Sequence, residues 1–130
     1  MSFNHGTVWW NELMTRDVPA AKRYYSEMCG WSFDEMPMMG EDNEVVGTYC
    51  LAMGHNRPLA GITDMSSMED LTDAPALWMT YLAVDDMRAA LDQTKTHGGK
   101  VLRAPFDVPG VGRISMIQDP GGALLGIMTP

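Results

Sequence analysis

The sequence lacks an excess of basic residues and any apolar run of membrane length. Nine Lys and Arg against seventeen Asp and Glu give a formal net charge of −8. This acidic balance argues against nucleic acid as a partner, because phosphate binding requires a basic patch. No apolar run approaches the ~20 residues that span a bilayer, so we expect no membrane partner.

Cysteines, histidines and targeting signals are equally sparse. Cys29 and Cys50 lack metal or redox spacing, and we expect buried free thiols in a reducing cytoplasm. The N-terminus lacks the basic and apolar stretches of a secretory signal. His5, His55 and His97 have no metal-ligand spacing and are expected to be solvated. No phosphate loop, dinucleotide fingerprint or Ser-His-Asp grouping is visible.

What the chain does contain is an internal repeat with an offset of 69 residues. The repeated residues are Trp9, Leu13, Asp17, Ala20, Ala21 and Gly30, which recur as Trp78, Leu82, Asp86, Ala89, Ala90 and Gly99. An ungapped repeat of this kind indicates two copies of one folding unit. We expect a single domain over 1–130, in which repeat 1 (about 5–65) and repeat 2 (about 76–130) share a core or pair across a dimer. A polar linker (about 66–75) joins them.

Each copy predicts the order β-α-β-β-β. In the first copy, the alternation of apolar and polar residues predicts a strand over 7–15. Asp17 as the N-cap and Gly30 as the terminator predict a helix over 20–28. Further strands are predicted near 31–35, 45–53 and 59–65. In the second copy, the same signals predict a strand over 77–84, a helix from Asp86 to His97 and strands near 100–104, 113–118 and 124–128. Asp119 is expected to shape the turn before the last strand. The Pro- and Gly-rich segment 105–112 predicts a loop, either a lid over a cavity or a plain surface loop.

This arrangement resembles the vicinal oxygen chelate superfamily, which includes glyoxalase I, bleomycin-resistance and extradiol dioxygenase families. The resemblance rests on LMTRDVPAAKRYYSEMCGW, on YLAVDDMRAAL followed by HGGKV, and on DPGGALLGI, which is similar to the family ending DPxGxxxEL. It implies an α+β fold in which two tandem β-α-β-β-β units form a cupped mixed sheet with helices on its outer face. It also implies a homodimer.

In metal-using members of that superfamily, four ligand positions line the inside of the cup. In this chain they correspond to Trp10, Gly61, Met79 and Gly126. None of these residues is a ligand for a divalent metal, since a thioether suits only soft ions such as Cu(I). We therefore expect no metal and no cofactor, and the loss of metal-dependent glyoxalase or dioxygenase chemistry.

Strand alternation predicts which side chains line the cup instead. Trp10, Glu12 and Met14 share one face, and the repeat places Met79 and Tyr81 on the matching face. The two glycines would leave room for a ligand. The chain has thirteen Met residues, which predict a Met-rich core or a Met-lined pocket. The predicted ligand contacts are Trp10, Met14, Gly61, Met79, Gly126 and Phe106. Trp9 and Trp78 would face the helices, in the core.

Glu12 has two interpretations. In an apolar cup its pKa would rise, so it suits a general acid or base, with Tyr81 as a hydrogen-bond donor. Alternatively, it recognises a cationic or hydroxyl group of a ligand, or forms a salt bridge to Arg57 or Arg113. Tyr81 is otherwise a core aromatic with a satisfied hydroxyl.

Two main hypotheses about function follow. The first is a protein that binds a small organic molecule, cationic or aromatic, in an apolar cup without a metal. The second is a metal-independent lyase, isomerase or hydroxylase-like enzyme that uses Glu12 and Tyr81 on a small oxygenated substrate. A pure interaction module is a third possibility that no feature of the sequence favours.

Overall fold

The computed structural model describes residues 4–40, 42–66, 68–108 and 111–130. The first half of the chain contains β1 (Val8–Thr15), α1 (Val18–Cys29), β2 (Ser32–Met39), β3 (Val45–Gly54) and β4 (Arg57–Asp64). A short 3₁₀ helix, η1 (Glu69–Leu71), precedes the second half. That half contains β5 (Leu77–Ala83), α2 (Met87–Thr96), β6 (Lys100–Val108), β7 (Gly112–Gln118) and β8 (Leu124–Thr129).

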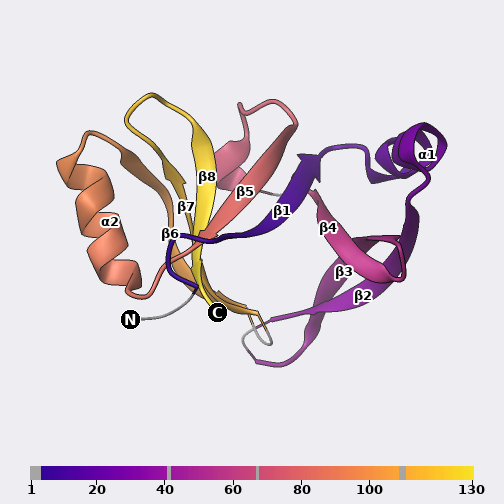
Figure 1. The fold of residues 1–130 in the computed structure, drawn as a ribbon, viewed down its shortest axis with the longest axis horizontal. Coiled ribbons are helices and arrows are strands. Elements are labelled where there is room, and N and C mark those ends of the chain that lie inside the picture. Colours follow the sequence, from indigo (N-terminus) through magenta and orange to yellow (C-terminus); the bar gives the residue numbers. More distant parts are fainter. Residues whose placement is uncertain (1–3, 41, 67, 109–110) are drawn as a thin grey trace.

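The strands form one eight-stranded sheet in the order β2-β3-β4-β1-β5-β8-β7-β6. The antiparallel pair β1–β5 lies at its centre, and each of these strands has a parallel neighbour, β4 or β8, on its other side. The sheet is strongly curved, with the two helices at opposite ends of the molecule (Figure 1). The expected α+β fold of two β-α-β-β-β units in a cupped mixed sheet is therefore confirmed, and one chain completes the sheet.

Both helices pack on the outer, convex face of the sheet. The Asp17 carboxylate accepts a hydrogen bond from the backbone N–H of Ala20, and Gly30 ends α1 in the left-handed conformation that glycine favours. Apolar side chains of α1 then cover Leu13 and Ile62. In the same way, α2 covers an apolar group formed by β7 and β8. The convex face is thus occupied, and the concave face is left to other groups.

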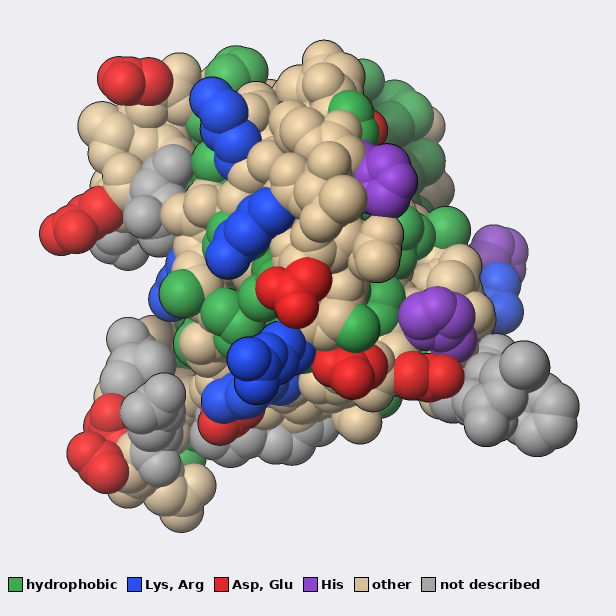
Figure 2. All heavy atoms as spheres, turned by 90° about the vertical axis from the view of Figure 1, so that its left-hand side faces the viewer, with side chains coloured by type: hydrophobic (Ala, Val, Ile, Leu, Met, Phe, Trp, Pro, Cys, Tyr) green, Lys and Arg blue, Asp and Glu red, His purple; other side chains and the backbone are tan. Residues whose placement is uncertain are grey.

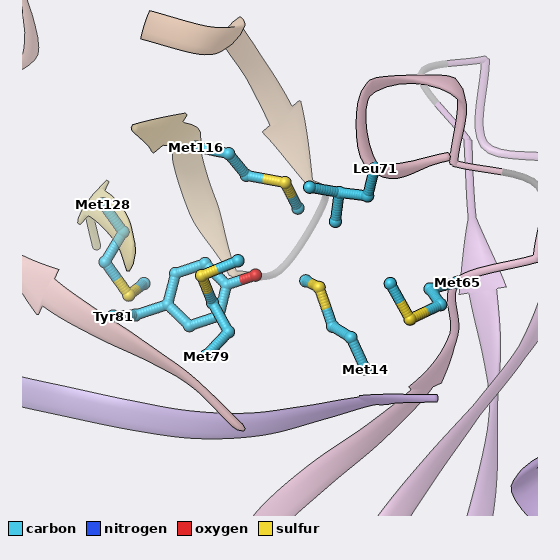
Figure 3. Packing of buried hydrophobic residues seen from close by; sticks show 7 residues of the cluster. All are labelled: Met14, Met65, Leu71, Met79, Tyr81, Met116 and Met128. Carbon is cyan, nitrogen blue, oxygen red and sulfur yellow. The ribbon is translucent and has the colours of Figure 1, made fainter. Parts of the chain in front are cut away.

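A cluster of methionines lies on the concave face. The cluster consists of Met14, Met65, Leu71, Met79, Tyr81, Met116 and Met128. Figure 3 shows these side chains converging from several strands toward a common centre. Burying one such side chain stabilises the fold by ~1.5–3 kcal/mol. The cup is therefore lined and largely filled by flexible thioethers.

The linker between the two halves covers this cluster, although its polar composition predicts a simple connection. Leu71 is only 2% exposed and points into the cluster from the covering loop (Figure 3). The guanidinium of Arg16 donates hydrogen bonds to the backbone carbonyls of Leu71, Thr72 and Ala74, at 3.0, 3.1 and 2.9 Å. We call residues 68–74 the cover.

Two strands, β2 and β6, run several residues past their predicted ends, and both contain proline. β2 continues through Pro37, and β6 runs through Pro105 to Val108, where the sequence predicts a loop over 105–112. These strands are the two edges of the sheet, and an edge strand tolerates a residue that cannot donate a backbone hydrogen bond. The segment predicted as a loop, either a lid or a plain surface loop, is therefore mostly strand. Its residues 109–110 lie outside the described residues.

Three predictions of burial are wrong. Trp9 is 41% exposed and Trp78 is 39% exposed. The Trp78 indole lies on the α1 side as expected, where its Nε1 donates to the Tyr25 hydroxyl at 3.1 Å. Cys29 is exposed because it is the last residue of α1, whereas Cys50 is buried as predicted. Trp78 thus makes edge-to-face contacts with Tyr25 and Trp31 at the surface instead of entering the core.

The surface over α2 carries mixed charges. Lys and Arg side chains lie there among Asp and Glu, without a patch of one sign (Figure 2). The three histidines are exposed, as predicted. Asp119 shapes its turn as expected, because its carboxylate accepts hydrogen bonds from the backbone N–H groups of Gly121 and Ala123. Neither helix in the described ranges has the length and apolar character to cross a bilayer.

The close packing of Tyr81 on the sheet predicts a steric effect at Gly126. A Cβ atom at this position would overlap the Tyr81 ring, which is anchored too near its own backbone to move aside. We expect Gly126→Ala to lower the free energy of unfolding by about 1–3 kcal/mol in urea denaturation. Gly121→Ala is the control, because its Cβ would make only an ordinary contact. Equal stability of the two variants would contradict this packing.

Candidate functional site

Glu12 is the central polar residue of the concave face. It lies on β1 opposite Met79 of β5 and beside Gly61 of β4, and only 8% of it is exposed. The Thr63 hydroxyl donates a hydrogen bond to its carboxylate. Glu12 is also hydrogen-bonded to the hydroxyls of Tyr81 and Tyr49. A buried carboxylate surrounded by three hydroxyls is the main polar feature of this face.

Trp10 extends this network by one step. Its indole Nε1 donates to the Tyr49 hydroxyl at 3.0 Å. The pairing of β1 with β5 shifts between Val8 and Trp10 and is regular from Trp10 onward, so Trp10, Glu12 and Met14 share one face. The predicted neighbours Trp10, Glu12 and Tyr81 are therefore brought together by direct or shared hydrogen bonds.

Tyr49 and Thr63 belong to the site but were not among the predicted residues. Cys50 packs with the α1 side, so strand alternation places the adjacent Tyr49 on the concave face. Thr63 lies two residues after Gly61 and shares its face for the same reason. Alternation along β3 and β4 was thus a signal that could have identified both hydroxyls.

The space above the two glycines is filled, contrary to prediction. The Tyr49 hydroxyl lies over Gly61, and the Tyr81 ring lies over Gly126, so closely that a Cβ atom would overlap each. A glycine in a strand often marks the close approach of another group, and here that group is a phenol of the protein itself. The glycines accommodate tyrosines rather than leave room for a ligand.

Burial controls the ionisation of this network. It raises the pKa of Glu12 above its ordinary value, and hydrogen bonds from Thr63, Tyr81 and Tyr49 offset part of the rise. Burial, followed by the charge of Glu12, raises the pKa of Tyr81 and of Tyr49 above the usual tyrosine range. Both phenols therefore stay protonated at neutral pH and donate hydrogen bonds.

The alternative in which Glu12 forms a salt bridge to Arg57 or Arg113 is wrong. Arg113 pairs with Asp107 at 3.1 Å on the neighbouring edge strand, and Arg57 is exposed at the start of β4. The hydroxyl groups of Thr63, Tyr81 and Tyr49 instead donate the hydrogen bonds that offset the cost of burying the Glu12 carboxylate. A hydroxyl can be buried at lower cost than a guanidinium.

The remaining predicted contacts lie around this network. Met14 and Met79 are fully buried within the methionine cluster. Phe106 is half-buried on β6, opposite Ile114, and the guanidinium of Arg103 lies 3.8 Å from its ring centroid. Arg103 was not predicted, because two irregularities in the β6–β7 pairing obscure the alternation of β6.

The residues at the family's metal-ligand positions do not fit a divalent metal. Trp10, Met79 and two glycines offer an indole, a thioether and no side-chain donor at all. Among the residues that the structure describes, no group of three or more His, Cys, Asp and Glu could hold a metal ion. We therefore assign no metal-dependent step to this site.

Comparison with known proteins places this geometry in a family. The model of the Glyoxalase/Bleomycin resistance protein/Dioxygenase superfamily matches residues 3–127. CFP32 of Mycobacterium tuberculosis, which is named as a glyoxylase, is 36% identical over 127 residues. These residues are 96% of this chain and 46% of that protein. The anthracycline biosynthesis protein DnrV of Streptomyces peucetius is 28% identical over 136 residues, 96% of this chain and 47% of that protein. The chain spans about half the length of these relatives.

Solved structures share the fold. Methylmalonyl-CoA epimerase from Mycobacterium tuberculosis has a TM-score of 0.60 at 18% identity, over 100% of this chain and 92% of that chain. The Streptomyces coelicolor epimerase in complex with 2-nitronate-propionyl-CoA has a TM-score of 0.62 at 14% identity, over 96% and 97%. At these identities the likeness shows the fold alone. The match over residues 3–127 shows that the chain belongs to the glyoxalase/bleomycin resistance protein/dioxygenase superfamily.

Proposed function

We propose that this chain binds a small, ring-bearing organic molecule against the concave face of its sheet, without a metal. The observation that carries the proposal is the buried Glu12 with its hydroxyl partners inside a methionine cluster. Burying a carboxylate costs stability even when it is hydrogen-bonded, and an apolar residue would pack there at no such cost. A buried polar group of this kind is typical of a functional site.

The methionine lining suits a site that adapts to its ligand. Five of the seven cluster members are Met, a flexible and polarisable side chain. Such side chains can change rotamer and re-pack around a bound molecule. The ligand then replaces contacts that Leu71 and the thioethers make in the closed form. Binding requires movement of the cover instead of a permanently open cavity.

An aromatic ligand fits better than a cationic one. Glu12 already has three hydroxyl partners and a raised pKa, so it does not require a cation. Trp10 instead offers a ring face at the network, Phe106 offers the ring face that Arg103 leaves uncovered, and stacking on such faces favours planar rings. DnrV is named for the biosynthesis of anthracyclines, a class of molecules with fused aromatic rings, and this agrees with an aromatic ligand.

A fluorescent aromatic probe tests the proposal. N-phenylnaphthylamine, which is neutral and brightens in apolar surroundings, should bind the wild-type protein. Trp10→Leu should weaken binding about tenfold through lost ring contacts, measured by fluorescence titration. Trp9→Leu is the matched control, because Trp9 lies at the irregularity in the β1–β5 pairing and is 41% exposed. Absence of binding to the wild type, or equal affinities of the two variants, would contradict the proposed site.

The cover predicts how the ligand enters. Arg16→Gln removes hydrogen bonds to three carbonyls of the cover, so the closed form loses stability relative to the open form. We expect N-phenylnaphthylamine to associate several-fold faster with this variant in stopped-flow fluorescence. Arg23→Gln, an exposed change on α1, controls for lost charge. An unchanged association rate would show that the ligand enters elsewhere.

A catalytic role is the second candidate, and the raised pKa of Glu12 beside the Tyr81 donor is the observation that favours it. In this case Glu12 transfers a proton while Tyr81 donates a hydrogen bond to a substrate oxygen. Glu12→Gln separates the two functions, because it abolishes proton transfer and retains the apolar lining. An enzyme would lose turnover in this variant and still bind N-phenylnaphthylamine.

The raised pKa also predicts how stability depends on pH. The folded state retains the Glu12 proton at pH values where the unfolded chain, with an ordinary pKa of 4.5, has lost it. The contribution of the Glu12 proton to the free energy of unfolding is therefore complete below the pKa that Glu12 has in the unfolded chain. This contribution is lost as pH rises through the higher pKa that Glu12 has in the folded state. In urea denaturation the wild type should lose stability relative to Glu12→Gln across this window. Glu27→Gln, an exposed change on α1, controls for lost charge, and a constant difference between wild type and Glu12→Gln would refute the shift.

A further inference from the structure

We infer that the ligand of the concave face carries an oxyanion, of the carboxylate or sulfonate class, that binds the guanidinium of Arg103. This inference rests on the proposed function and adds a charge to the ring-bearing ligand described above. It makes Arg103 the residue that selects for the charge of the ligand.

The strand pairing places Arg103 on the concave side. Arg103 lies directly opposite Met116 of β7, and Met116 is a member of the methionine cluster. Residues directly opposite in an antiparallel pair share a face. The positive charge of Arg103 also acts on the Tyr81 hydroxyl, so the guanidinium lies within electrostatic reach of the Glu12 network.

Phe106 holds this guanidinium in a defined position. The Arg103 Cζ atom lies 3.8 Å from the ring centroid of Phe106, which is the geometry of a cation–π contact. Arginine side chains stack readily on aromatic faces, and a stacked guanidinium keeps its N–H donors available at its edge. The planar donor fork is therefore pre-organised, which favours a carboxylate or sulfonate over a single point charge.

Charge compensation distinguishes Arg103 from the other polar groups of this face. Within the described part of the chain, the ion pairs join His5 to Asp85, Lys22 to Glu35 and Arg113 to Asp107, and Arg103 is in none of them. Glu12, in contrast, has its hydroxyl partners. A half-buried cation that faces a binding surface and takes part in none of these ion pairs favours an anionic group on the ligand.

Two probes that differ by one anionic group test the inference. Anilinonaphthalene sulfonate is N-phenylnaphthylamine with a sulfonate added, so the ratio of their affinities isolates the contribution of the charge. The wild type should prefer the sulfonate. Arg103→Gln should weaken sulfonate binding about tenfold or more and leave the neutral probe unchanged, because a hydrogen bond to a charged group is lost. Arg103→Lys should retain part of the preference, since it keeps the charge and loses the fork.

Arg88→Gln is the matched control, because it removes the same charge from the exposed face of α2. It should leave both affinities within about twofold, as expected for a screened surface charge. Neutral probe binding by Arg103→Gln shows that the variant is folded. If the neutral probe binds and Arg103→Gln keeps the sulfonate preference, the role of Arg103 is refuted and the proposed function stands. If neither probe binds the wild type, both fail.

Discussion

The antiparallel pairing of β1 with β5 is the constraint on which the rest of this structure depends. It joins the two halves into one sheet and sets Trp10 opposite Tyr81 and Glu12 opposite Met79. A slip of one residue would turn Glu12 toward the convex face, where apolar side chains of α1 pack. The irregularity between Val8 and Trp10 precedes these residues, so the register of the central network is preserved.

This register places a polar network and a soft apolar cluster in the same space. The hydroxyls of Thr63, Tyr49 and Tyr81 reduce the cost of burying Glu12, and the methionines fill the remaining volume. Rigid aliphatic residues would favour one packing, whereas methionines permit several of similar energy. The cover closes this arrangement in two ways: its backbone carbonyls accept hydrogen bonds from Arg16, and its side chains Met68, Leu71 and Ala74 pack against the methionine cluster. Opening the cover therefore requires both sets of contacts to break.

Patterns within a single strand predicted the site residues whose positions follow from the alternation of that strand. Alternation along β1 and the repeat offset were sufficient to bring Glu12 and Tyr81 together. The positions of Arg103 and of the cover could not be predicted from local patterns. Arg103 is positioned by the irregular pairing of β6 with β7, and the cover is held by hydrogen bonds from Arg16. Pro105 indicated a loop because its missing donor disfavours a central strand, and only the position of β6 at the sheet edge makes it acceptable.

Gly61 and Gly126 show how this cup differs from one built around a metal. The family's ligand positions in the last strand of each half hold glycine here, and each glycine has a tyrosine directly above it. A carboxylate or imidazole at either position would occupy the place of the phenol. The absence of a side chain at these two positions is therefore what allows Tyr49 and Tyr81 to reach Glu12. Under the proposed function, a molecule bound on this face would meet phenol hydroxyls and thioethers, and its recognition would depend on hydrogen bonding and ring contacts rather than on Lewis acidity.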